Sequence, residues 1–81
     1  MKEKIKAIIL ENTEMLTAEE LTDDLQLITS GFIDSFEIIQ MIDRFEQEFH
    51  VALPLEDIEL SDFESVNDIE RMLLAKGEKS A

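Results

Sequence analysis

The chain of 81 residues contains no cysteine, tryptophan or tyrosine, and it has only one proline, two glycines and one histidine. Without cysteine it can form neither disulfides nor thiolate metal sites, and any thiol that it uses must be added. The single His50 excludes zinc sites built from several imidazoles. No apolar run approaches the ~20 residues of a membrane-spanning helix, and none follows the N-terminal lysines for long enough to form a signal peptide. We therefore expect one small cytoplasmic domain, residues 1–81.

Basic residues are also scarce, and most of them lie near the two ends. Between Ala7 and Glu70, Arg44 is the only lysine or arginine, against 18 carboxylates, and the formal net charge is −13. Such a surface repels nucleic acids and anionic membranes and attracts proteins with basic patches. We expect a monomer with protein partners, no nucleic-acid partner and no membrane insertion. The competing explanation is that the acidic residues only keep a small domain soluble.

Apolar residues recur at helical spacing, and no segment alternates as a strand does. The spacing predicts helices over Lys2–Asn12 and Ser35–Phe49, and Ser65, with Asp68 three residues later, predicts the start of a last helix. Pro54 predicts a short helix that runs through Glu59. The expected fold is an all-α bundle of three longer helices and one short helix. The helix over Ser35–Phe49 has its expected core positions at Ile38, Met41, Ile42, Phe45 and Phe49, with Ile39 at the border.

The remaining segments are a long loop and a tail. Residues 13–34 show no helical period, but Thr17 and Glu20 have the spacing of a capping box, and four leucine and isoleucine residues between positions 21 and 28 predict an ordered loop. Gly77 is a candidate helix C-cap. We expect residues 1–75 to be folded and residues 76–81 to form a flexible tail.

The start of the helix at Ser35 carries the most informative pattern. Asp34 is a good N-cap, and Glu37 three residues later completes a pair that resembles a capping box. Gly31 supplies backbone freedom for a sharp turn, and the two apolar residues after it can hold the turn against the core. Ser35 then occupies the first helical turn, where its hydroxyl is expected to point to solvent.

Two kinds of chemistry are excluded at this serine. His50 lies 15 residues beyond Ser35, which is about 22 Å along a helix, so no serine–histidine pair of a hydrolase can form. The segment also resembles part of a calcium-binding EF-hand loop. However, its third ligand position would be Ile28, which cannot coordinate calcium. We expect neither catalytic residues nor a metal site.

The segment Gly-Phe-Ile-Asp-Ser-Phe (31–36), the helix ending Phe-Glu-Gln-Glu-Phe (45–49) and the segment Val-Ala-Leu-Pro-Leu-Glu-Asp (51–57) together resemble acyl and peptidyl carrier proteins over nearly the whole chain. The resemblance implies an up-and-down four-helix bundle without enzymatic activity. It also implies that 4′-phosphopantetheine is attached through a phosphodiester to Ser35, next to the cap Asp34. A phosphopantetheinyl transferase would add the group. A loading ligase and acyl-transfer enzymes with basic patches would then be its partners.

The resemblance further implies that partners bind the helix after Ser35, at Phe36, Gln40, Asp43, Glu46 and Gln47. Phe36 stands where many family members have an exposed leucine, and a half-buried aromatic is the alternative. This face is less acidic than that of fatty-acid carriers, and Leu60–Val66 resembles the same segment of dedicated stand-alone carriers.

These features favour a specialised carrier of acyl or aminoacyl thioesters in fatty acid, polyketide or nonribosomal peptide biosynthesis. A D-alanyl carrier for teichoic acids is the alternative within the class. An unmodified acidic helical adaptor is the alternative from another class.

Overall fold

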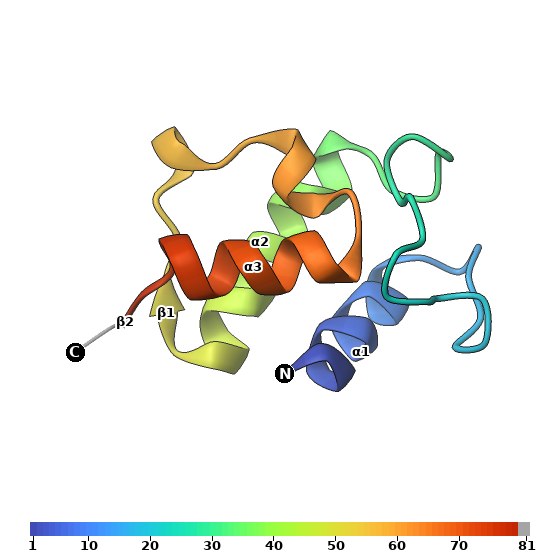
Figure 1. Ribbon diagram of the computed structural model, residues 1–81, viewed down its shortest axis with the longest axis horizontal. Coiled ribbons are helices and arrows are strands. Elements are labelled where there is room, and N and C mark those ends of the chain that lie inside the picture. Colours follow the sequence, from blue (N-terminus) through green and yellow to red (C-terminus); the bar gives the residue numbers. More distant parts are fainter. Residues whose placement is uncertain (80–81) are drawn as a thin grey trace.

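The computed structural model describes residues 1–79 and is mostly helical (Figure 1). Three α-helices, α1 (Lys2–Asn12), α2 (Ser35–Phe49) and α3 (Val66–Lys76), make up most of the ordered chain. A loop of residues 13–34 joins α1 to α2. Two short 3₁₀ helices, η1 (Leu55–Asp57) and η2 (Leu60–Phe63), lie between α2 and α3, and the two-residue strands β1 (Val51–Ala52) and β2 (Glu78–Lys79) form an antiparallel pair.

The predicted bounds of the first two helices are confirmed, and so are the caps of the last one. The Ser65 hydroxyl oxygen accepts a hydrogen bond of 3.1 Å from the amide of Asp68 at the start of α3. Gly77 follows the last residue of α3 in an extended conformation. A Cβ atom on Gly77 would lie 2.5 Å from the carbonyl oxygen of Leu73, so a larger residue would push the backbone away from the helix end.

The short helix predicted from Pro54 through Glu59 forms only as the single 3₁₀ turn η1, so its predicted end is wrong, and the count of four helices is not confirmed. The η1 turn ends at Asp57, and Ile58 and Glu59 are both extended. A second turn begins beyond them because the Asp62 carboxylate accepts a hydrogen bond of 2.9 Å from the amide of Glu59. The Asp62 side chain that ends the extended stretch thus lies beyond Glu59, the predicted end of the helix.

The chain also departs from the expected tail boundary after residue 75. Lys76 belongs to α3, and β2 pairs with β1 so that Val51 lies opposite Lys79 and Ala52 lies opposite Glu78. The pairing joins the end of the described chain to the segment that follows α2. Residues 80 and 81 of the expected tail lie outside the described residues.

The core joins all three helices to the connecting segments. α1 packs against both α2 and α3, and α3 crosses in front of α2 in Figure 1. Phe45 of α2 is fully buried between two other aromatic rings, those of Phe49 and Phe63, with centroids 6.3 Å away in both cases. Phe49 itself is only partly buried, at the edge of the core.

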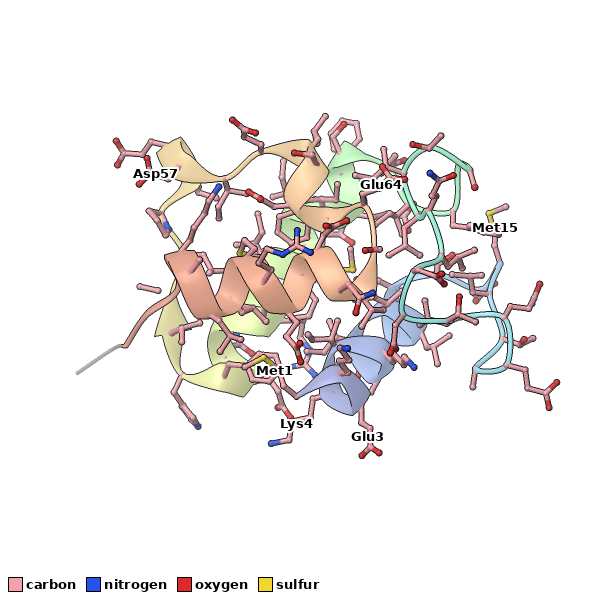
Figure 2. The ribbon with its side chains drawn as sticks, in the orientation of Figure 1. Met1, Glu3, Lys4, Met15, Asp57 and Glu64 are labelled. Atoms are coloured by element: carbon pink, nitrogen blue, oxygen red, sulfur yellow. The ribbon has the colours of Figure 1, made fainter. Side chains whose placement is uncertain are left out.

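The long loop before α2 is ordered by hydrogen bonds to the segment just before α3. The amide of Leu27 donates to the Glu64 carbonyl oxygen at 2.6 Å, and the amide of Thr29 donates to the Glu64 carboxylate at 3.0 Å. Figure 2 shows Glu64 beside this loop. The predicted capping box is formed too, since the amides of Thr17 and Glu20 each donate to the other residue's side chain. Leu21 and Leu27 are buried, so the predicted order of the loop is confirmed.

Candidate functional site

The approach to Ser35 is a tight turn centred on Gly31. Gly31 has a φ of 82°, a conformation that residues with a side chain rarely adopt. The amides of Phe32 and Ile33 both donate to the carbonyl oxygen of Leu27, at 2.8 and 3.2 Å. Ile33 is buried and Phe32 packs against the core, as the sequence predicted. The turn therefore holds the start of α2 in a fixed place relative to the core.

Asp34 caps α2 as predicted. Its carboxylate accepts a hydrogen bond of 2.9 Å from the amide of Glu37, and its carbonyl oxygen accepts one of 3.0 Å from the amide of Ile38. The reciprocal bond of a capping box, from the Asp34 amide to the Glu37 side chain, is not formed among residues 1–79. Within the same described range, the amides of Ser35 and Phe36 have no protein acceptor.

Ser35 is the first residue of α2, and its side chain is exposed. Its hydroxyl therefore lies beside the two amides without a protein acceptor and at the positive end of the helix dipole. Such a helix end favours a phosphate group, because the N–H groups and the dipole both attract negative charge. An accessible hydroxyl next to these donors fits a phosphodiester, and no buried side chain would have to move to admit one.

The outer face of α2 continues from Ser35 as an exposed stripe. Phe36 is 78% exposed, which excludes the half-buried alternative for this side chain. Gln40, Asp43 and Gln47 follow on the same face and are exposed, and the Gln47 amide group donates to the Asp43 carboxylate at 3.1 Å. The structure thus brings together four of the five residues predicted to contact partners.

Glu46, the fifth predicted partner residue, is occupied within the fold. It is half-buried, and its carboxylate accepts a hydrogen bond of 2.8 Å from the amide of Leu53. Glu46 is ten residues beyond Phe36, and this spacing separates the two side chains by about 80° around the helix axis. Glu46 therefore lies at the edge of the exposed stripe. We therefore assign Glu46 to the junction between α2 and the segment after β1.

Ile39, which the helical spacing predicts at the border of the core, is a surface residue. It is 64% exposed and lies one turn beyond Ser35 and three residues beyond Phe36. Residues at these spacings are neighbours on a helix surface. A second exposed apolar side chain therefore adjoins the serine. Its spacing from Ser35 was visible in the sequence, but its exposure depends on how α2 is rotated against α1.

Ion pairs on the surface connect the elements around this site. Arg44 of α2 binds Glu11 of α1 with contacts of 3.2 and 3.4 Å, and the carboxylate raises the pKa of Arg44. Asp23 of the long loop is bonded to Lys6 at 2.8 Å, and this bond lowers the pKa of Asp23. Arg44 therefore faces α1, which leaves the exposed stripe of α2 without a positive charge of its own.

Among residues 1–79, no three or more histidine or acidic side chains gather as metal ligands. None of the helices in this range is long and apolar enough to cross a membrane.

The chain matches a known protein family over most of its length. Residues 3–73 match the family described as "Phosphopantetheine attachment site", and no solved structure matches the chain. Members of this family attach 4′-phosphopantetheine covalently to a serine and are not themselves enzymes. With most of its length matched and an exposed serine at the start of α2, the chain belongs to the phosphopantetheine-binding carrier family.

Proposed function

We propose that Ser35 is the residue to which 4′-phosphopantetheine is attached, and that the protein carries acyl or aminoacyl groups between partner enzymes. One observation carries the choice of residue. Ser35 is an exposed serine at the first position of a long helix, beside two amides without a protein acceptor. Both amides and the helix dipole stabilise a phosphodiester at this position.

The remaining residues around the site position the serine and do not activate it. Asp34 starts the helix, and Gly31 and Ile33 fix the turn before it against the core. When attached, the pantetheine arm supplies a terminal thiol that can hold an acyl group as a thioester. The protein has no cysteine, so this would be its only thiol.

Partner enzymes are proposed to bind the exposed stripe of α2. Carrier domains of this family work with a phosphopantetheinyl transferase and with enzymes that handle acyl groups. Phe36 and Ile39 offer apolar contact area beside the serine, and Asp43 offers a negative charge that attracts basic patches. Gln40 and Gln47 are neutral, so this stripe carries little charge for such an acidic protein.

The low charge of this stripe favours a specialised pathway. We propose polyketide, nonribosomal peptide or dedicated fatty-acyl biosynthesis, and the D-alanylation of teichoic acids is the alternative within the carrier class. An unmodified adaptor that binds partners through α2 is the alternative from another class. Modification of Ser35 separates the adaptor from every carrier.

The test uses coenzyme A and a broad-specificity phosphopantetheinyl transferase. Intact-mass measurement is expected to show one added group on the wild type, and a thiol reagent is expected to count one thiol. Ser35→Ala is expected to remain unmodified. Ser30→Ala is the matched control, because Ser30 is an exposed serine in the preceding turn. This variant is expected to be modified as fully as the wild type.

Two outcomes would contradict attachment at Ser35. A wild-type protein that is never modified would support the adaptor, provided that circular dichroism shows it folded. Full modification of Ser35→Ala would move the attachment site to another residue.

A further inference from the structure

The segment of residues 54–62, here called the connector, runs from the end of β1 into η2, and Ile58 is its one side chain that packs against the hydrophobic core. Leu53 before it and Phe63 after it are both buried. Within the connector no residue is buried, and only Pro54, Ile58 and Asp62 are even half-buried. Segments with few buried contacts open locally at a low cost in free energy.

The backbone hydrogen bonds of the connector are almost all local. The amides of Asp57, Ile58 and Asp62 each donate to a carbonyl oxygen three residues earlier. The amide of Glu59 donates to the Asp62 carboxylate, again three residues away. Such bonds shape the two 3₁₀ turns but do not attach them to the rest of the molecule.

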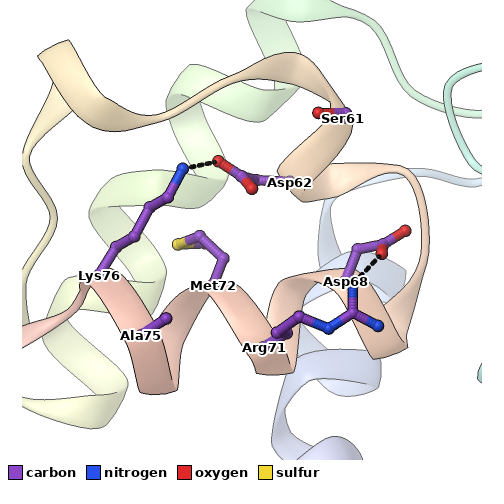
Figure 3. Close-up of a pocket in the computed structure, with 7 residues that line it drawn as sticks. All are labelled: Ser61, Asp62, Asp68, Arg71, Met72, Ala75 and Lys76. Atoms are coloured by element: carbon purple, nitrogen blue, oxygen red, sulfur yellow. Dashed lines mark hydrogen bonds and ion pairs between the residues drawn. The ribbon is translucent and has the colours of Figure 1, made fainter.

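One side chain of α3 makes all the hydrogen bonds between the connector and that helix in the described chain. Lys76, the last residue of α3, donates to the carbonyl oxygen of Asp57 at 2.6 Å and to the carboxylate of Asp62 at 2.8 Å (Figure 3). Within residues 1–79 these are the only hydrogen bonds between the connector and α3. They hold Asp57 at the end of η1 and Asp62 within η2 at the same time.

A cavity of about 350 Å³ lies between the connector and α3, next to these bonds. Met72 and Ala75 contribute its apolar lining, and Figure 3 shows Lys76 and Asp62 meeting across it. Arg71 and Asp68 form a second ion pair of 3.2 Å in the lining, but both residues belong to α3. Only the Lys76 pair therefore spans the space from one wall to the other.

We propose that Lys76 is a latch that keeps the connector closed over this cavity, and that the connector opens as a local unit when the latch is released. The ends of the connector stay attached in the open form. Leu53 is held by Glu46 and by its own burial, and Phe63 is held in the core. This device is independent of the attachment of a prosthetic group at Ser35.

The charges around Lys76 support its role. Asp57, Glu59 and Asp62 all act on it from the connector, and its hydrogen bond with Asp62 is the main cause of its raised pKa. Three acidic residues so close together would repel one another without the cation. Removal of the positive charge therefore both breaks two bonds and leaves this repulsion uncompensated.

The experiment is native-state amide hydrogen exchange, followed by NMR, on Lys76→Gln and the wild type. The amides of Ile58, Glu59 and Asp62 are expected to exchange roughly three- to tenfold faster in the variant. The amide of Leu53 and the amides of α1 and α2 are expected to be unchanged. Added salt is expected to speed exchange of the connector in the wild type more than in the variant, because salt screens the latch.

Two control variants distinguish the latch from a general loss of charge. Arg71→Gln breaks the other ion pair of the cavity and is expected to leave connector exchange unchanged. Lys76→Arg keeps the charge and is expected to retain most of the protection. Unchanged connector exchange in Lys76→Gln would overturn the proposal. Equal acceleration throughout the protein, or acceleration that begins in the last turn of α3, would overturn it as well.

Discussion

Replacement of Asp34 by alanine tests how the start of α2, and with it Ser35, is held in place. The change removes the carboxylate that accepts the bond from the amide of Glu37. Three first-turn amides, of Ser35, Phe36 and Glu37, would then lack a protein acceptor. The backbone bond from Ile38 to the Asp34 carbonyl oxygen survives, so the helix is retained. The loss of an N-cap of this kind costs about 1 kcal/mol, within a range of about 0.5–2 kcal/mol.

That cost converts into a measurable change of melting temperature. For a domain of this size, about 1 kcal/mol corresponds to a fall of roughly 4–8 °C, measured by far-UV circular dichroism. Asp34→Ser keeps a capping oxygen but loses the charge. It is expected to lose only the interaction with the helix dipole, which is about 0.3–1 kcal/mol. If Asp34→Ala has the same melting temperature as the wild type, the cap does not stabilise the start of α2. If both variants lower the melting temperature by the same amount, the charge of Asp34 and not its capping bond is responsible.

Three further predictions concern the turn, an ion pair and the proposed partner surface. Because residue 31 has a positive φ, Gly31→Ala is expected to lower the free energy of unfolding, measured by chemical denaturation, by about 1–2 kcal/mol, and Gly31→Asn by less. Equal stability of the alanine variant and the wild type would show that this backbone conformation does not require glycine. Bonding to Lys6 lowers the pKa of Asp23, so the stability that this pair adds is present above the unfolded pKa of about 3.9 and is lost as pH falls through the lower folded pKa. The wild type should therefore have a higher melting temperature than Asp23→Asn at neutral pH, and a difference in melting temperature that widens on acidification would refute this pH dependence. Phe36→Ala is expected to keep its stability to within about 0.5 kcal/mol but to lower kcat/KM for the transferase, and an unchanged kcat/KM would place the contact elsewhere.

Local sequence signals determined the three α-helices and the position of Ser35 at the start of α2. The ends of α2 follow from the cap at Asp34 and from apolar residues spaced for one buried face, and the start of α3 follows from Ser65 and Asp68. These signals act over three or four residues, within one or two turns of the chain. The turn at Gly31 is likewise local, because its conformation is set by the backbone of a single residue. The position of Ser35 at the helix start and the exposure of its side chain could therefore be predicted without the tertiary structure.

Contacts between distant segments decided the rest. Ile39 was expected at the core border but is exposed, although Ile38 and Ile42 on the same helix are buried. Glu46 was expected to face partners but binds the amide of Leu53, and Lys76 was expected in a flexible tail but binds the connector. The backbone groups that Glu46 and Lys76 contact lie seven and 19 residues away from them along the chain. Sequence spacing specifies neighbours along one helix, whereas these partners meet only when separate elements pack together.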